Sequence, residues 1–297
     1  MNKRYKLKEK IYRWIFGLLA FTSLIFLLGI TITLFSESLP LFKHYPLHNF
    51  LFGRYWYPTY DPPEFGALPL ILASLLVTAG AMFVCVPLGI GSALYLTELA
   101  SHRQRTVLKP LIEVLASIPS VVYGFFGMVI VAPFVQKVFH LPTGLTALTG
   151  SLVLGIMATP TVTSLSEDAI NFVPKSFREA SLALGANRWQ TVVKVVIPSA
   201  SSGIFTAIIL GISRAIGETM TVLMVTGGSA VIPKSLFQPV RPITSTIAAE
   251  MGETVMGSLH YNALFALGLL LFLITLFFNI IAEIINRKHR IRLGAGR

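Results

Sequence analysis

Six long apolar stretches alternate with more polar segments along the chain, and each stretch is long enough to cross a lipid bilayer. An α-helix rises about 1.5 Å per residue, so a membrane-spanning helix needs about 20 mostly apolar residues. The stretches that meet this length are residues 12–35, 68–96, 111–135, 145–165, 199–225 and 262–285. The pattern therefore predicts an all-α, polytopic membrane protein with six transmembrane helices.

The first apolar stretch follows a basic segment, as the core of a signal peptide would. Its apolar run is longer than such a core, and no small-residue cleavage pattern follows it, so we interpret it as an uncleaved anchor. The predicted organisation is a tail at 1–11, a transmembrane anchor at 12–36, an extracytoplasmic loop at 37–67, a transmembrane domain at 68–286 and a tail at 287–297.

Lysine and arginine are distributed unevenly between the two sides that six spans define. Of 24 such residues, 18 lie at the two ends of the chain and in the connections after spans two and four, whereas 5 lie in the other connections. Loops rich in lysine and arginine stay on the cytoplasmic side. We therefore predict that both termini are cytoplasmic. The remaining basic residue, Arg214, lies inside the fifth span.

Composition supports the membrane interpretation and excludes several kinds of functional site. Hydrophobic residues make up 54% of the 297 residues and charged residues 12%, whereas an ordinary soluble protein has about 25% charged residues. In so apolar a chain, the net charge of +11 does not indicate a partner nucleic acid. The single cysteine, Cys85, excludes an intrachain disulfide, and the chain has no G-x-x-x-x-G-K-[ST] loop for ATP. We expect no cofactor and no metal site.

The connection between spans four and five, residues 167–198, has the pattern of two short helices. Apolar residues recur at helical spacing over 175–185, and Gly185 is suited to end the first helix. Asn187 is a typical N-cap for a second helix, which we expect Pro198 to close. The pattern alone also fits a plain amphipathic linker on the lipid headgroups.

The same connection contains E-A-S-L-A-L-G-A-N-R-W-Q-T-V-V-K-V-V-I-P, which resembles the EAA loop of ABC importer permeases. The positions of that motif are occupied by Glu179, Ala180, Gly185, Ile197 and Pro198. Ser181 stands where the motif often has alanine. The resemblance implies the fold of a type I ABC importer permease.

In that family the EAA loop forms a coupling helix that docks on the ATP-hydrolysing subunit, and hinge or rigid-body movement transmits ATP binding to the spans. The resemblance implies that Arg178 and Glu179 flank the contact, that Ala180 and Ser181 belong to the coupling helix, and that Gly185 allows the turn. It also implies a transport subunit that is not an enzyme, because ATP is hydrolysed in a separate partner.

The fifth span carries two ionisable residues, Arg214 and Glu218, which a four-residue spacing places on one helical face, with Thr221 beyond them. A charge at the bilayer centre costs about 2.5–3.5 kcal/mol on insertion scales, so such residues pair with each other or face a polar pathway. Arginine suits a tetrahedral oxyanion because its forked donors bind two oxygens at once. The pattern leaves open both a structural ion pair and an anion pathway.

A second G-E-T sequence occurs at residues 252–254, before the sixth span. Its segment is too short and too polar to span the membrane, so we interpret it as a re-entrant or interfacial helix. We include Glu253 among the pathway residues, although Glu250 and Glu253 fit solvated positions equally well.

Four passages together resemble the phosphate permeases, the PstC/PstA family of ABC importers. They are W-Y-P…F-G-A-L-P-L-I (56–71), I-P-S-V-V-Y-G-F-F-G (118–127), S-R-A-I-G-E-T-M (213–220) and A-A-E-M-G-E-T (248–254). The first of them looks like the PstC type. In that family the arginine and glutamate of the R-A-x-G-E-T motif are implicated in phosphate passage, and they correspond here to Arg214 and Glu218.

The resemblance implies an ATP-driven phosphate importer in the plasma (inner) membrane of a prokaryote, in which this chain forms half of the translocation pathway. Its implied partners are a PstA-like permease subunit, a dimer of ATP-binding subunits, an extracytoplasmic phosphate-binding protein, phosphate and membrane lipid. The alternatives are an ABC permease for another oxyanion (molybdate or sulfate), a secondary carrier driven by an ion gradient, and a membrane scaffold in which Arg214 and Glu218 are structural.

Overall fold

The structure, a computed structural model, describes the backbone of residues 3–292 and the side chains of residue 9 and residues 11–285. Most basic residues expected in the two tails therefore lie outside the described side chains. In chain order the elements are α1 Lys3–His44, α2 Leu47–Phe52, β1 Trp56–Tyr57, β2 Glu64–Phe65, α3 Leu68–Leu94, η1 Tyr95–Leu99, α4 His102–Ser117, α5 Ser120–Phe126, η2 Gly127–Val131, α6 Ala132–Val138, α7 Ala147–Asn171, α8 Lys175–Ala183, α9 Arg188–Thr191, η3 Val192–Val196, α10 Ile197–Gly217, α11 Met220–Val225, α12 Ile243–Glu250 and α13 Leu259–Arg292. The segments η1, η2 and η3 are π-helical turns.

Six helical segments within the described residues are long and apolar enough to cross a membrane, which confirms the predicted number. They are Ile11–His44, Leu68–Leu99, Ser120–Val138, Ala147–Asn171, Arg188–Gly217 and Leu259–Ile285.

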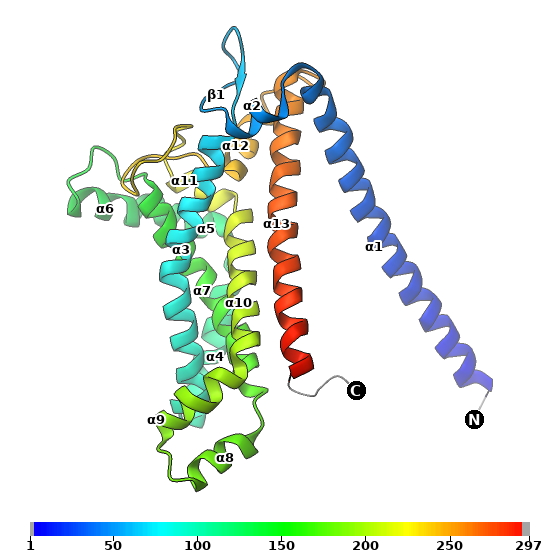
Figure 1. Ribbon diagram of the computed structural model, residues 1–297, viewed down its shortest axis with the longest axis vertical. Helices are drawn as coiled ribbons and strands as arrows, with labels where there is room; N and C mark the ends of the chain where they lie inside the picture. Colours follow the sequence, from blue (N-terminus) through cyan, green and yellow to red (C-terminus); the bar gives the residue numbers. More distant parts are fainter. Residues whose placement is uncertain (1–2, 293–297) are drawn as a thin grey trace.

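Helices α3, α7 and α10 form the centre of the bundle, and α7 lies between the other two (Figure 1). The three backbones approach closely because glycines face Val162 of α7 from both sides. A Cβ atom added to Gly89 of α3 would lie 2.9 Å from Val162 Cγ1, and one added to Gly211 of α10 would lie 2.7 Å from Val162 Cγ2. Small residues at such contacts let membrane helices pack by van der Waals attraction, because lipid supplies no hydrophobic force between them.

Helix α1 diverges from this bundle and meets α13 only toward one end (Figure 1). Its apolar side chains are exposed along most of its length, as at Phe16, which is 67% exposed. Contact is made near the end of the helix, where Leu41 is fully buried and Asn262 Nδ2 donates a hydrogen bond to the Glu37 carbonyl (2.8 Å). The helix is longer than the anchor predicted at 12–36, since it covers part of the predicted tail and continues through 37–44.

The third span begins later than predicted. We expected one helix over 111–135, but α4 ends at Ser117 and α5 starts at Ser120. Pro119 explains the break, because proline disfavours helical backbone at the residue before it, and Ile118 is extended (ψ 129°). Helix α4 is therefore a separate element that precedes the span.

The helix that leads into the fifth span is also different from the prediction. Pro198 does not close it, because α9, η3 and α10 run on as one helical segment, Arg188–Gly217. The π-helical turn η3 ends at Val196, two residues before Pro198, and shifts the hydrogen-bond register there. Pro198 then lies in the first turn of α10, where its missing N–H is tolerated.

The two ends of the bundle differ in character (Figure 1). One end holds α8 and α9, and the first turns of α1 and the last turns of α13 point toward it. The opposite end holds α2, α12 and the two-residue strands β1 and β2, which pair antiparallel. A buried cluster that includes Phe50, Trp56, Phe65 and Ile243 joins these elements to α13.

Candidate functional site

The segment from α8 to α9 forms the predicted pair of short helices with a sharp turn. Gly185 has a φ of +85°, a left-handed conformation that residues with a Cβ rarely adopt. Asn187 caps α9 through a reciprocal pair of hydrogen bonds with Gln190, at 2.8 and 2.9 Å. Both local signals in the sequence are therefore confirmed, and the two helices have a fixed relation to each other.

Two of the residues assigned to coupling point back into the chain. Arg178 donates two hydrogen bonds to Glu98 Oε1 of η1, from Nε at 3.1 Å and from Nη2 at 2.7 Å. It also donates to the carbonyls of Val173 (2.7 Å) and Ile170 (3.1 Å) at the end of α7. These four bonds tie α8 to α7 and η1.

The second inward residue, Ser181, is buried and forms a hydrogen bond with the hydroxyl of Thr191 (2.9 Å), which joins α8 to α9. Glu179 and Ala180, in contrast, are exposed. A groove of about 480 Å³ opens between the helices, and it is lined by Phe177, Ala180, Ser181, Leu184, Ala186, Gln190, Lys194 and Val195.

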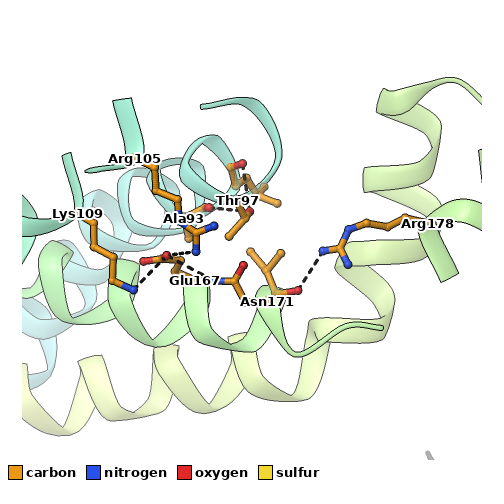
Figure 2. A network of polar contacts seen from close by, with 9 residues as sticks. Ala93, Thr97, Arg105, Lys109, Glu167, Asn171 and Arg178 are labelled. Atoms are coloured by element: carbon orange, nitrogen blue, oxygen red, sulfur yellow. Dashed lines mark hydrogen bonds and ion pairs between the residues drawn. The ribbon is translucent and has the colours of Figure 1, made fainter. Parts of the chain in front are cut away.

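A buried carboxylate that the sequence analysis did not single out lies near the same end of the bundle (Figure 2). The side chain of Glu167 on α7 is 2% exposed and accepts hydrogen bonds from Arg105 Nη2 (2.8 Å) and Lys109 Nζ (3.3 Å) of α4. Asn171 Nδ2 donates a third bond at 3.4 Å. The sequence did contain a signal for this contact. A carboxylate follows the fourth predicted span, and a basic connection follows the second, on the same side of the membrane.

The fifth span breaks where its ionisable residues lie. Helix α10 ends at Gly217, Glu218 is extended (φ −68°, ψ 132°), and α11 starts at Met220. The prediction of one continuous helical face for Arg214, Glu218 and Thr221 is therefore wrong. No ion pair joins Arg214 to Glu218 among the described side chains. Arg214 lies in the last turn of α10, and its Nη1 donates to the Thr161 hydroxyl of α7.

Contacts with α12 and α5 stabilise the interruption between α10 and α11. The Thr244 hydroxyl of α12 donates to the Glu218 carbonyl (2.6 Å), and Glu218 Oε1 accepts from the Thr221 backbone N–H (3.3 Å). Thr221 is fully buried and its hydroxyl donates to the Ser120 carbonyl (3.0 Å) at the start of α5. The interrupted helix thus lies where α5, α10, α11 and α12 meet, as in the discontinuous helices of membrane transporters.

The two carboxylates of the second G-E-T region differ in their surroundings. Glu250 is 14% exposed and binds Arg241 Nη1 (2.6 Å), His260 Nε2 (2.9 Å) and Trp56 Nε1 (3.0 Å), so it joins α12 to β1 and α13. Glu253 is exposed in the turn after α12 and is not brought together with Arg214 by any of these contacts. Among the described residues, no group of three His, Cys, Asp or Glu side chains could hold a metal ion.

Comparison with solved structures supports the predicted architecture. The chain is similar to a bacterial ABC transporter for alginate in complex with its periplasmic protein, with a TM-score of 0.64 over 95% of this chain and 96% of that one, at 13% identity. It is also similar to the MetNI methionine ABC transporter, with a TM-score of 0.58 over 73% of this chain and 93% of that one, at 19% identity. The fold is therefore that of a type I ABC importer permease.

Sequence comparison gives the family. The chain is 41% identical to a probable ABC transporter permease, YqgH of Bacillus subtilis, over 82% of this chain and 79% of that protein. It is 35% identical to the phosphate transport system permease protein PstC of Mesorhizobium japonicum, over 99% of this chain and 94% of that protein. A family model described as binding-protein-dependent transport system inner membrane component matches residues 85–291. The chain belongs to this family of multi-pass membrane permeases.

Proposed function

We propose that this chain is the PstC-type permease subunit of an ATP-driven phosphate importer. The observation that carries the proposal is the similarity to a protein named as a PstC phosphate permease over 99% of this chain, a length that contains the fifth span with Arg214 and Glu218. As a permease the chain is a transport subunit and not itself an enzyme. Phosphate is thus the cargo, and no covalent step is assigned to the chain.

In this proposal Arg214 is the residue that phosphate meets inside the membrane. Its guanidinium offers several donors in a planar fork, and among the described side chains the Thr161 hydroxyl engages one of them. The remaining donors suit two oxygens of a tetrahedral anion. Glu218 at the helix break supplies a negative charge that opposes tight retention, and Thr221 fixes the break against α5. Glu253 is proposed as a residue of the outer approach.

Helix α8 is proposed as the coupling helix that docks on the ATPase. Its exposed Glu179 and Ala180 and the adjoining groove supply the contact surface, while Arg178, Ser181 and Gly185 hold the helix in position. A rigid helix can be moved as a unit by its partner. The end with α8 then faces the cytoplasm, which assigns both termini to that side, in agreement with the uneven distribution of lysine and arginine.

The family implies an ATPase and a substrate-binding protein as partners. We assign to this importer a second, PstA-like permease subunit, two copies of the ATPase, and an extracytoplasmic protein that delivers phosphate to the end with α12. The exposed apolar surface of α1 would lie in lipid.

Uptake of radiolabelled phosphate tests the proposal in a strain that lacks this chain and in the same strain with the chain restored. We expect restored uptake that an excess of unlabelled phosphate abolishes and that equal concentrations of sulfate or molybdate leave unchanged. If molybdate or sulfate abolished the uptake of radiolabelled phosphate, that oxyanion would be favoured as the cargo. Restored uptake in the absence of any ATPase partner would indicate a secondary carrier.

A further inference from the structure

The buried carboxylate of Glu167 stands out among the charged groups that the proposed function does not use. It is 2% exposed, whereas its partners Arg105 and Lys109 are 40% and 36% exposed. A buried carboxylate is tolerated only when it is paired and hydrogen-bonded. Glu167 accepts hydrogen bonds from both cationic side chains and from the Asn171 amide. Glu167 therefore holds α4 against α7 at one defined position.

On one side this contact adjoins the anchoring point of α8. Arg178 of α8 binds the carbonyl of Ile170, which lies one turn beyond Glu167 on α7, and the carbonyl of Val173 just after the helix. Figure 2 shows Arg178 near the end of α7 that carries Glu167 and Asn171. A displacement of α8 must therefore move the last two turns of α7 or break these bonds. Glu167 lies within those turns and passes the displacement to α4.

On the other side α4 leads to the broken fifth span. The Tyr123 hydroxyl of α5 donates to the Leu115 carbonyl of α4 (2.9 Å), so α4 and α5 stay joined across Pro119. The first residue of α5, Ser120, in turn accepts the hydrogen bond from the Thr221 hydroxyl of α11 (3.0 Å). The contacts form a continuous series from α8 through α7, α4 and α5 to the break beside Glu218.

We infer that Glu167 is a positioning residue that transmits movement of α8 to the broken fifth span by holding α4 on α7. The inference rests on the proposed function, because it takes α8 as the element that the ATPase moves. Glu167 does not touch the transported anion. Its contribution is a charged contact that keeps two elements moving together, and this contact links the two sites energetically.

The variant Glu167→Gln tests the inference, because glutamine has nearly the same shape and can still accept one hydrogen bond, but lacks the charge that attracts both cations. The matched control is Asp168→Asn, the same chemical change at the exposed neighbouring residue of α7. The full complex is reconstituted in vesicles, and phosphate uptake and ATP hydrolysis are measured on the same preparation. We expect Glu167→Gln to lower the phosphate taken up per ATP hydrolysed by about tenfold, and Asp168→Asn to leave this ratio unchanged.

A second variant keeps the inference testable if Glu167→Gln assembles poorly. Arg105→Gln combined with Lys109→Gln removes the same attraction from the half-exposed side, and we expect the same loss of coupling. Adding Glu167→Gln to that pair should cause little further loss of coupling, because the effects of substitutions at contacting residues are not additive.

An unchanged ratio of uptake to hydrolysis in both variants would overturn the inference. So would a fall in uptake and hydrolysis in proportion to the amount of assembled complex, since that is the result of a purely structural contact. A wild-type complex that takes up molybdate or sulfate but not phosphate would refute the proposed cargo alone, and the ratio measured with that anion would then test Glu167.

Discussion

Replacement of Arg178 by alanine is expected to release helix α8 from the bundle. The variant loses two charge-assisted bonds to Glu98 and two bonds to the carbonyls of Ile170 and Val173. It also leaves the Glu98 carboxylate, which is 15% exposed, without the cation that compensates its burial.

The size of the effect follows from this geometry. Removal of one partner from a fully buried pair costs about 3–5 kcal/mol. Both side chains here keep some access to water, since Arg178 is 22% exposed, and a value of about 2–3 kcal/mol is therefore appropriate. Because 1.4 kcal/mol corresponds to a factor of ten, local opening of α8 should become about 30- to 150-fold more frequent.

Hydrogen–deuterium exchange of the nucleotide-free complex measures this opening directly, through the protection of the amides of α8. The matched control is Lys175→Ala, which removes an exposed cation from the same helix. Protection of α8 in the Arg178 variant equal to that in the wild type, or an equal loss in both variants, would refute the reasoning that Arg178 anchors the helix.

Three further predictions concern the pathway, the turn and the bundle. Arg214→Gln should lower phosphate uptake by about 10- to 150-fold, the value of one charge-assisted hydrogen bond, while the amount of assembled complex stays the same; normal uptake would remove Arg214 from the pathway. Gly185→Val should lower co-purification of the ATPase, because a β-branched residue is strained at a φ of +85°, whereas Gly185→Asn should keep it; equal yields would count against a role for the turn. Gly203→Val should lower the free energy of unfolding of the purified chain by about 1–3 kcal/mol, because the new side chain would overlap Ala169. Gly17→Val should leave it unchanged, because a side chain there meets open space.

The sequence predicted those features that depend on neighbouring residues. The six spans follow from the length of the apolar runs, and the turn between α8 and α9 follows from Gly185 and Asn187, whose preferences are local. The beginning of the third span was predicted incorrectly because apolar residues continue across Pro119, so hydrophobicity alone did not reveal the break.

The features that the sequence did not predict depend on contacts between distant segments. The break at Glu218 is stabilised by Thr244, which is 26 residues away, and nothing in the residues around Glu218 indicates that partner. Glu167 finds Arg105 and Lys109 at separations of 62 and 58 residues. The residue type of each proposed pathway residue could be read from the sequence, whereas its contacts depend on how the helices pack.

The location of Arg214 in the last turn of α10 has a kinetic consequence for an anion that reaches it. The carbonyls at the end of a helix lack partners inside it, and together they act like about half an elementary negative charge. The guanidinium at this helix end therefore attracts an anion with a field that is already partly cancelled, and the carboxylate of Glu218 just beyond the helix lowers it further. Residence time on a site is governed mainly by the dissociation rate. In the proposed pathway, the weakened field shortens the stay of each anion at Arg214, so the helix end itself favours rapid release over storage.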